Sequence, residues 1–316
     1  MNRRLRRVLT ILLVLSIVFT ISCKDETASP QNLAFETLTD YLVANDLDIS
    51  NVLTGWIIAA ADVVDNESDY YIIDIRADSI YNVGHIPGAV NSTLGNILTT
   101  AETSGGKPIL VVCYTGQGAG HGVCALRLSG YDDAKVLKWG MSGWSGDFDS
   151  WTGNVGNAAD GNANWTTDAT ATVADFEGAE LDVNADEEDG AAILAERVEV
   201  MLAGSFKGVT NADVLASPAN YFINNYWAAG DVDLYGHIVG AYRINPLTVA
   251  GEEIYNLDPD KTVVTYCWTG QTSSVITAYL TVLGYDAASL KFGANGMIYD
   301  NLADHKWSAS PDYDYE

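Results

Sequence analysis

Two cysteines of this chain stand in nearly the same local sequence. Cys113 follows an apolar run at 107–112 and opens the pattern Cys-Tyr-Thr-Gly-Gln, and Cys267 follows a similar run at 261–266 and opens Cys-Trp-Thr-Gly-Gln. Each run is typical of a buried strand, and the residues after each glycine-containing turn predict a helix. Such a turn directs backbone N–H groups and the positive end of the helix dipole at the thiol, which favours the nucleophilic thiolate. We therefore take both cysteines as candidate nucleophiles, with a buried structural cysteine as the alternative.

The helices expected behind the two cysteines differ in how they begin. Thr272, Ser273 and Ser274 offer side-chain oxygens that can cap the second helix, whereas the first helix begins near the sequence Gly-Ala-Gly at 118–120. Serine and threonine are good N-caps, and alanine is a poor one. The loop at Cys267 is therefore predicted to be the better ordered of the two.

The similarity extends beyond the cysteines themselves. Gly-Tyr-Asp occurs 17 residues after each cysteine, at 130–132 and 284–286, and Gly-His-Ile occurs before each, at 84–86 and 236–238. Matches in one order at a spacing near 154 residues indicate two copies of a domain rather than a solenoid. Strand-like runs alternate with helix-like stretches in both copies, which predicts an α/β fold with parallel strands.

Three short motifs occur in a fixed order in the first copy: Asp-Ile-Arg at 74–76, Gly-His-Ile-Pro-Gly-Ala at 84–89 and Cys-Tyr-Thr-Gly-Gln at 113–117. Together they resemble the rhodanese (sulfurtransferase) family. The resemblance implies two tandem rhodanese-like domains, each a parallel sheet flanked by helices with the active cysteine at a strand end. It also implies that the cysteine takes sulfane sulfur from a donor such as thiosulfate or 3-mercaptopyruvate. The sulfur is carried as a persulfide and passed to a thiol or cyanide, with no metal or organic cofactor.

The resemblance also implies roles for individual residues. Cys113 and Cys267 are the expected catalytic residues, and Asp74 and Arg76 are expected to support the first site. The loops expected to surround the persulfide or substrate consist of Tyr114, Thr115, Gly116, Gln117 and Gly118 in the first copy and Trp268, Thr269, Gly270, Gln271 and Thr272 in the second.

The second copy has diverged before its cysteine. Residues 221–226 take the place of the strand that carries Asp74 in the first copy. We expect Asn224 at the position of Asp74 and Tyr226 at that of Arg76.

Other residues with reactive side chains are assigned structural roles. His85 and His237 are expected to anchor the turns of their Gly-His-Ile motifs. His121, in the first turn of its helix, is expected to be exposed, with lowering of the Cys113 pKa as the alternative. Cys124 is interpreted as a small buried residue, with a resolving thiol as the alternative. No group of cysteines and histidines has the spacing of a zinc site.

Residues 1–22 are predicted to be a lipoprotein signal peptide. Four arginines among residues 3–7 precede an apolar run at 8–21, which is too short for a comfortable membrane span, and Thr-Ile-Ser-Cys at 20–23 resembles a bacterial lipobox. Lipid attached to Cys23 would anchor the chain to a membrane of the bacterial cell envelope. An ordinary secretory signal peptide cleaved nearby is the alternative.

Composition divides the rest of the chain. Lysine and arginine are absent between Lys138 and Arg197, and Asp, Asn, Gly and Thr dominate at 146–190, which predicts an acidic linker or a long excursion on the surface. Within it, residues 160–168 carry oxygens at alternate positions like a calcium loop, but Trp165 stands where the turn requires glycine. A helix containing Leu38 is expected to pack on the sheet of the first domain. The expected segments are a tether at 23–32, rhodanese-like domains at 33–151 and 191–304, the linker at 152–190 and a polar tail at 305–316.

The charge of the chain limits its partners. The formal net charge is −26, and loss of the four signal arginines makes it −30. Nucleic-acid binding needs a basic surface and is therefore not expected. An anionic sulfur donor gains no long-range attraction, so its site must be built locally from loop amides and a helix dipole.

Three functions are compatible with such cysteine loops. Sulfur transfer is the first, and a non-catalytic persulfide carrier or binding module at the cell envelope is the second. A cysteine phosphatase is the third, but that chemistry needs a loop arginine to hold the phosphoryl oxygens, and neither 113–120 nor 267–274 contains one. Both loops also lack the basic residue found in efficient thiosulfate-using members of the resembling family, which keeps the carrier function open.

Overall fold

The computed structural model describes residues 30–316, with side chains from Leu33 onward. The predictions made for the signal segment, for lipidation at Cys23 and for most of the tether lie outside the described residues. Within the described part, no helix is both long and apolar enough to cross a membrane.

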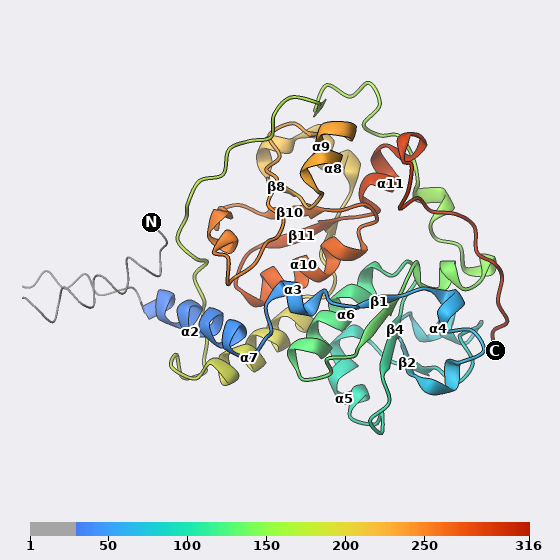
Figure 1. Ribbon diagram of the computed structural model, residues 1–316. Coiled ribbons are helices and arrows are strands. Elements are labelled where there is room, and N and C mark those ends of the chain that lie inside the picture. Colours follow the sequence, from blue (N-terminus) through green and yellow to red (C-terminus); the bar gives the residue numbers. More distant parts are fainter. Residues whose placement is uncertain (1–29) are drawn as a thin grey trace, which may run out of the picture. The chain divides into compact units, whose positions relative to one another are not determined.

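The described chain contains two parallel sheets, one in each half (Figure 1). The first sheet has the strand order β1-β5-β4-β2-β3, and the second has the order β7-β11-β10-β8. The predicted fold class is therefore confirmed. The strands of the first sheet are β1 (Ile57–Ile58), β2 (Tyr71–Asp74), β3 (Val90–Asn91), β4 (Ile109–Val112) and β5 (Lys135–Leu137), and those of the second are β7 (Gly208–Val209), β8 (Phe222–Asn225), β10 (Val263–Tyr266) and β11 (Ala287–Leu290).

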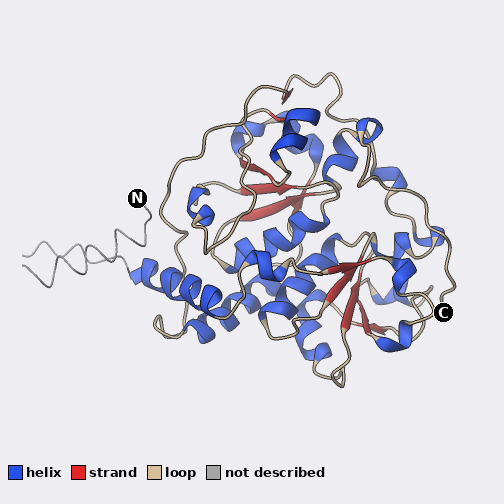
Figure 2. Ribbon diagram, viewed as in Figure 1, coloured by secondary structure: helices blue, strands red, loops and turns tan. Residues whose placement is uncertain are grey.

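Two helices cover the facing sides of these sheets. Both central strands, β4 and β10, are buried along their whole length, which explains why their sequences are apolar without alternation. Helix α6 (Gln117–Leu128) packs on β4 and β5, and α10 (Gln271–Val282) packs on β10 and β11. The two helices also pack against each other and thereby join the halves (Figure 2).

Eight further helices of the described chain surround this centre. Several begin without a side-chain cap, but Thr210 caps α8 and Asp189 caps α7 by accepting backbone N–H groups. These helices are α2 (Pro30–Ala44), α3 (Ile49–Val52), α4 (Asp78–Tyr81), α5 (Ile97–Ala101), α7 (Gly190–Ala203), α8 (Asn211–Ala216), α9 (Ala229–Tyr235) and α11 (Gly293–Met297).

Helix α2 makes contacts that differ from those expected. It was predicted to lie on the sheet of the first half, but the ring of Phe35 packs edge-on against Tyr255 and Tyr285, 5.9 and 6.3 Å away between centroids. Asp48, just after this helix, accepts hydrogen bonds from the backbone of Val249 and Ala250. Conversely, α7 of the second half contacts α6 of the first. The first helix of each half thus reaches across to the other half.

The acidic segment at 152–190 is not a free linker. Its strand β6 (Trp165–Thr166) pairs antiparallel with β9 (His237–Ile238), and Ala179 and Leu181 are buried in the main core. The segment winds around the second half, as the green to yellow-green trace in Figure 1 shows. Apolar residues spaced between the acidic ones drive this packing. They are too few to change the average composition of the segment, which is acidic and polar.

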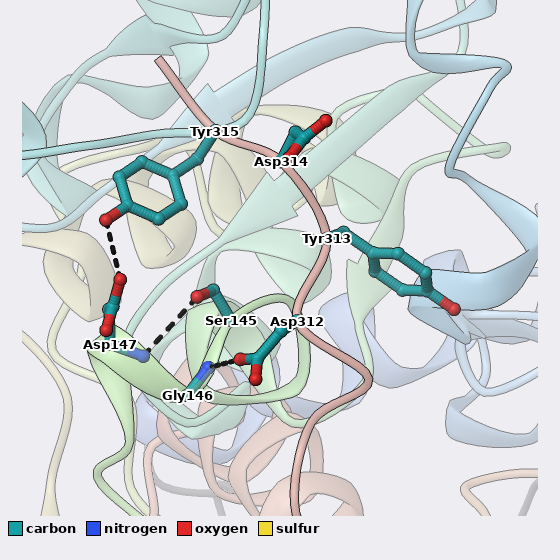
Figure 3. A pocket seen from close by; sticks show the side chains of 7 residues that line it. All are labelled: Ser145, Gly146, Asp147, Asp312, Tyr313, Asp314 and Tyr315. Carbon is teal, nitrogen blue, oxygen red and sulfur yellow. Dashed lines mark hydrogen bonds between the residues drawn. The ribbon is translucent and has the colours of Figure 1, made fainter.

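The tail at 305–316 also differs from its prediction. It returns to the first half, where the ring of Tyr313 packs against Trp144 and the Tyr315 hydroxyl donates to Asp147 over 2.7 Å (Figure 3). The backbones of Glu316 and His85 exchange hydrogen bonds of 2.8 and 3.0 Å. The last residues therefore form a strap over the first half rather than a solvated tail.

Candidate active site

Cys113 lies where β4 ends and the turn before α6 begins. The residue is buried, with 5% of its surface exposed. The backbone N–H groups of Gly116 and Ala119 donate to Sγ over 3.2 and 3.3 Å. Gly116 has φ = 80°, a left-handed conformation that suits glycine, and it brings its own amide to the thiol. The predicted cradle of amides around Cys113 is therefore present.

A glycine outside the predicted loop packs against the back of this turn. Gly140 has φ = 61°, and a Cβ placed there would overlap the carbonyl oxygen of Cys113 and the amide of Gly116. Next to it, the N–H of Met141 donates to the Cys113 carbonyl over 2.8 Å. The signal was in the sequence, since Leu-Lys-Trp-Gly at 137–140 is repeated as Leu-Lys-Phe-Gly at 290–293.

The environment of the Cys113 thiol has opposing effects on its pKa. Burial is the largest and raises the pKa, because it removes the water that would solvate a thiolate. The amides of Ala119, Thr115 and Gly116 lower it, and the carboxylate of Asp74 raises it further. The amides of the turn thus favour the thiolate as expected, but burial outweighs them and the net shift of the Cys113 pKa is upward.

Asp74 and Arg76 form a buried pair at the end of the neighbouring strand β2. Both side chains are at most 1% exposed, and Arg76 Nη2 donates to Asp74 Oδ2 over 2.6 Å while Nε donates to both carboxylate oxygens over 3.0 Å. Arg76 Nη2 also donates to the carbonyl of Gly84 over 2.7 Å, and its guanidinium lies 4.9 Å from the centroid of the Phe148 ring. The pair fixes the turn at Gly84 relative to β2. It does not line the cavity at Cys113.

A cavity of 340 Å³ opens above Cys113. Four residues of the predicted loop line it, and Gly116, the fifth, contributes its amide to the thiol. The other wall comes from the second half and was not predicted. The lining residues are Ile75, Leu94, Cys113, Tyr114, Thr115, Gln117, Gly118, Ser205, Phe206, Lys291 and Phe292.

Cys267 lies at the corresponding strand end of the second half, in a different environment. The residue is buried, with 2% of its surface exposed. Sγ accepts a 3.4 Å hydrogen bond from the N–H of Ser273 and lies 3.6 Å from the Ser273 hydroxyl oxygen. That hydroxyl also lies 2.8 Å from the hydroxyl of Ser289. A serine side chain therefore occupies space beside Cys267 where the first half has Ala119.

The capping predicted for α10 is not found. The N-cap residue is Gly270, with φ = 77° and no side-chain hydrogen bond, in the same geometry as Gly116 at the start of α6. Ser273 faces the thiol, and the Ser274 hydroxyl donates to the carbonyl of Gln271 over 2.8 Å. The physical basis for expecting a better ordered loop at Cys267 is thus absent.

The strand register corrects the expected equivalences in the second half. Asp74 pairs with Val112, the residue before Cys113, and Asn225 pairs with Tyr266, the residue before Cys267. Asn225, not Asn224, therefore occupies the position of Asp74. By the same count, Trp227 rather than Tyr226 stands at the position of Arg76. The hydrogen bonds agree, since the N–H two residues on donates to the Asp74 side chain in one half and to the Asn225 side chain in the other.

The family model for the rhodanese-like domain matches residues 59–147 and 216–297, which together make up more than half of the chain. The chain belongs to the rhodanese-like family. Its two matched regions correspond to the two halves described above.

Individual relatives match smaller parts. The thiosulfate sulfurtransferase GlpE of Shewanella oneidensis is 36% identical over 76 residues, which cover 23% of this chain and 73% of that protein. Among solved structures, the thiosulfate sulfurtransferase from Pseudomonas aeruginosa has a TM-score of 0.30 at 15% identity and covers 90% of this chain and 49% of its own. The 3-mercaptopyruvate sulfurtransferase from Leishmania major has a TM-score of 0.28 at 12% identity, with coverage of 77% and 73%. The family assignment rests on the family model.

Hydrogen bonds between their cysteine loops connect the two rhodanese-like domains. Gln117 Oε1 accepts from the N–H of Phe292 over 2.9 Å, and Gln271 Nε2 donates to the carbonyl of Thr115 over 3.3 Å. Of the remaining loop residues predicted for the second domain, Thr269 accepts from the N–H of Gln271 over 3.2 Å. The glutamines of the repeated Thr-Gly-Gln motif therefore join the two domains.

Aromatic rings fill the surroundings of the second rhodanese-like loop. Trp268 stacks on Trp227 with centroids 4.3 Å apart and on His305 with centroids 5.4 Å apart. The position held by Arg76 in the first domain thus carries part of an aromatic stack in the second.

The histidines and the third described cysteine are structural in their contacts. His85 stacks on Tyr81 at 3.8 Å, and the ring nitrogens of His237 lie within 2.9 Å of two backbone carbonyls. His121 is buried rather than exposed as predicted, and burial lowers its pKa to about 3, so it is neutral and does not assist the Cys113 thiolate. Burial strongly raises the pKa of the Cys124 thiol, which makes a resolving role unfavourable.

Proposed function

We propose that this chain is a sulfurtransferase that carries sulfane sulfur as a persulfide on Cys113. The observation that supports this most strongly is the pair of amides on Cys113 Sγ at the floor of the 340 Å³ cavity. Amides directed at a sulfur atom stabilise the negative charge of a bound persulfide as they would an oxyanion. The cavity gives a small donor access to that atom.

The reaction proceeds in two displacements. The Cys113 thiolate attacks the outer sulfur of the donor, the Sγ–S bond forms, and the bond between that sulfur and the rest of the donor breaks. With thiosulfate the leaving group is sulfite. An acceptor thiolate or cyanide then attacks the outer sulfur of the persulfide, and the Cys113 thiolate is released.

Phosphate-ester hydrolysis finds less support. The residues lining the cavity include no arginine, and the guanidinium of Arg76 is engaged by Asp74 and Gly84. A transferring phosphoryl group therefore has no bidentate partner at this site.

Mass spectrometry of the intact protein tests the proposal. After incubation with thiosulfate or 3-mercaptopyruvate, we expect one sulfur atom bound to Cys113, which is absent in Cys113→Ala and which cyanide removes as thiocyanate. Absence of an adduct on Cys113 with every donor would contradict the proposal. An adduct that forms but never turns over with cyanide or thiols would instead favour the carrier function.

The proposed second site at Cys267 stays a prediction, and the same spectra test it. Two independent sites give two adducts, of which Cys267→Ala removes one. The serine beside the Cys267 thiol and its lower exposure favour slower loading than at Cys113.

We also propose that the chain is a lipoprotein of the bacterial cell envelope. The support is the sequence alone, namely the basic start, the apolar run and the lipobox-like residues at 20–23. Lipid at Cys23 would hold the sulfurtransferase at a membrane surface.

A further inference from the structure

The wall of the cavity opposite Cys113 is supplied by the second domain. Two short segments contribute it, Ser205–Phe206 before β7 and Lys291–Phe292 after β11. A donor bound at Cys113 must therefore contact both domains.

Hydrogen bonds and ring contacts hold these second-domain residues in place. Phe292 has φ = 63°, its N–H donates to Gln117, and its ring packs edge-on against Trp151 at 5.0 Å. The ring of Phe206 packs edge-on against the buried, neutral His121 at 5.1 Å. A wall positioned in this way can discriminate between ligands, because it need not rearrange when one binds.

The cavity is lined by mostly apolar side chains and by one cationic group. Lys291 carries the only full positive charge among the lining residues, and none of them is acidic. Most of the remaining surface belongs to carbon-rich side chains, namely those of Ile75, Leu94, Tyr114, Phe206 and Phe292. A volume of 340 Å³ lies within the usual range for small-molecule pockets, about 300–1,000 Å³.

Such a lining suits some sulfur donors better than others. A compact inorganic dianion loses its hydration on entry and meets one ammonium group and many apolar atoms that cannot replace the lost hydrogen bonds. An organic monoanion loses less hydration free energy, because it carries one charge, which Lys291 can pair. Its carbon body also covers the apolar wall of the cavity and removes that surface from water.

We propose that Lys291, Phe206 and Phe292 of the second domain determine the donor specificity of Cys113, and that the preferred donor is a small organic monoanion with an apolar body. The inference rests on the proposed sulfur transfer at Cys113 and extends it to the substrate class. With a thiosulfonate, the Cys113 thiolate attacks the outer sulfur, the Sγ–S bond forms, the bond to the sulfonyl sulfur breaks, and a sulfinate leaves. Charge and electrons balance without any oxidant.

The chain offers a matched control for Lys291. Lys138 occupies the same place in the first domain's Leu-Lys-Trp-Gly segment, and its ammonium lies 5.4 Å from the centroid of the Trp139 ring. It does not line the cavity at Cys113. Lys138→Gln therefore removes one lysine of the same repeat and the same unit of net charge without touching the cavity.

The test uses thiosulfate, methanethiosulfonate and benzenethiosulfonate, which share the outer sulfur and differ in charge and apolar body. We expect kcat/KM with cyanide as acceptor to rise in that order. Lys291→Gln should raise KM for both thiosulfonates by about ten-fold, the size of one charge-assisted hydrogen bond, with little change in kcat. Phe206→Ala should reduce the preference for the benzene over the methane compound by about ten-fold, and Lys138→Gln should change nothing.

The outcomes separate this inference from the function on which it rests. Thiosulfate as the best donor, or equal effects of Lys291→Gln and Lys138→Gln, would overturn the specificity assignment while leaving sulfur transfer intact. No persulfide on Cys113 with any of the three donors would overturn sulfur transfer itself. Thermal unfolding of each variant is measured first, and Phe206→Leu replaces the alanine variant if that protein does not fold.

Discussion

The buried pair of Asp74 and Arg76 allows a quantitative test of how the first domain is held together. In Arg76→Met the carboxylate of Asp74 keeps its burial but loses both hydrogen-bonded nitrogens of the arginine, and Gly84 loses its donor. Removing one partner of a buried ion pair costs about 3–5 kcal/mol, because an uncompensated charge remains. A domain is stable by about 5–15 kcal/mol, so this loss is a large part of the total.

The control removes both charges together. In Asp74→Asn/Arg76→Met no uncompensated charge remains, and the second domain, with Asn225 and Trp227 at these positions, shows that an uncharged combination is compatible with the fold. We expect the double variant to be more stable than Arg76→Met by about 2 kcal/mol or more. Urea unfolding at pH 7, followed by tryptophan fluorescence and by amide exchange in the first domain, measures both. A loss below about 1 kcal/mol for Arg76→Met, or a double variant no better than the single one, would refute the reasoning.

Three further predictions concern Cys113, Gly140 and Cys23. Because burial raises the pKa of the Cys113 thiol, its alkylation by iodoacetamide should increase with pH to a midpoint above that of the same cysteine in urea; a midpoint below it would show that the amides outweigh burial. Gly140→Ala should slow persulfide formation by on the order of 100-fold, because its Cβ displaces the turn at Cys113, whereas Gly130→Ala, also at positive φ but facing open space, should leave the rate of loading unchanged; equal rates in both variants would contradict this. Cys23→Ala should release the chain from membranes or leave the precursor unprocessed, as fractionation and mass spectrometry would show, and continued detergent-dependent recovery would mean that the anchor is something else.

The parts of the fold that follow local rules were predictable from the sequence. The strands before Cys113 and Cys267 are buried on both faces, so their apolar runs are continuous, and the glycine at the start of each following helix adopts a left-handed conformation that only its residue type indicates. Because the sequence is repeated, each element predicted in the first copy was also predicted in the second. Sequence alone therefore predicted two parallel sheets with a cysteine at the end of a strand in each.

Register and long-range packing were harder to predict. Strand β8 is buried along its whole length, so no alternation of polar and apolar residues distinguishes Asn224 from Asn225, and a shift of one residue went unnoticed. The ring contacts of Phe35 with the second half and the burial of Leu181 depend on residues more than 100 positions away in the chain. The composition of the segment shows the acidic residues around Leu181 but not the distant residues that bury it.

The repeated Leu-Lys-aromatic-Gly segment explains how two copies of one domain produce unequal sites. In both copies the aromatic residue has a left-handed backbone, with φ = 68° at Trp139 and 63° at Phe292, and the following glycine touches its own cysteine turn from behind. Trp139 packs against Trp151 at 4.6 Å and Trp307 at 5.4 Å, within a cluster of indole rings. Phe292 also packs against Trp151, at 5.0 Å, and in addition lines the cavity above Cys113. The same backbone conformation thus places an indole in a cluster of tryptophan rings in one copy and a phenyl ring in the wall of the cavity at Cys113 in the other, so the two copies differ in more than the residues beside their cysteines.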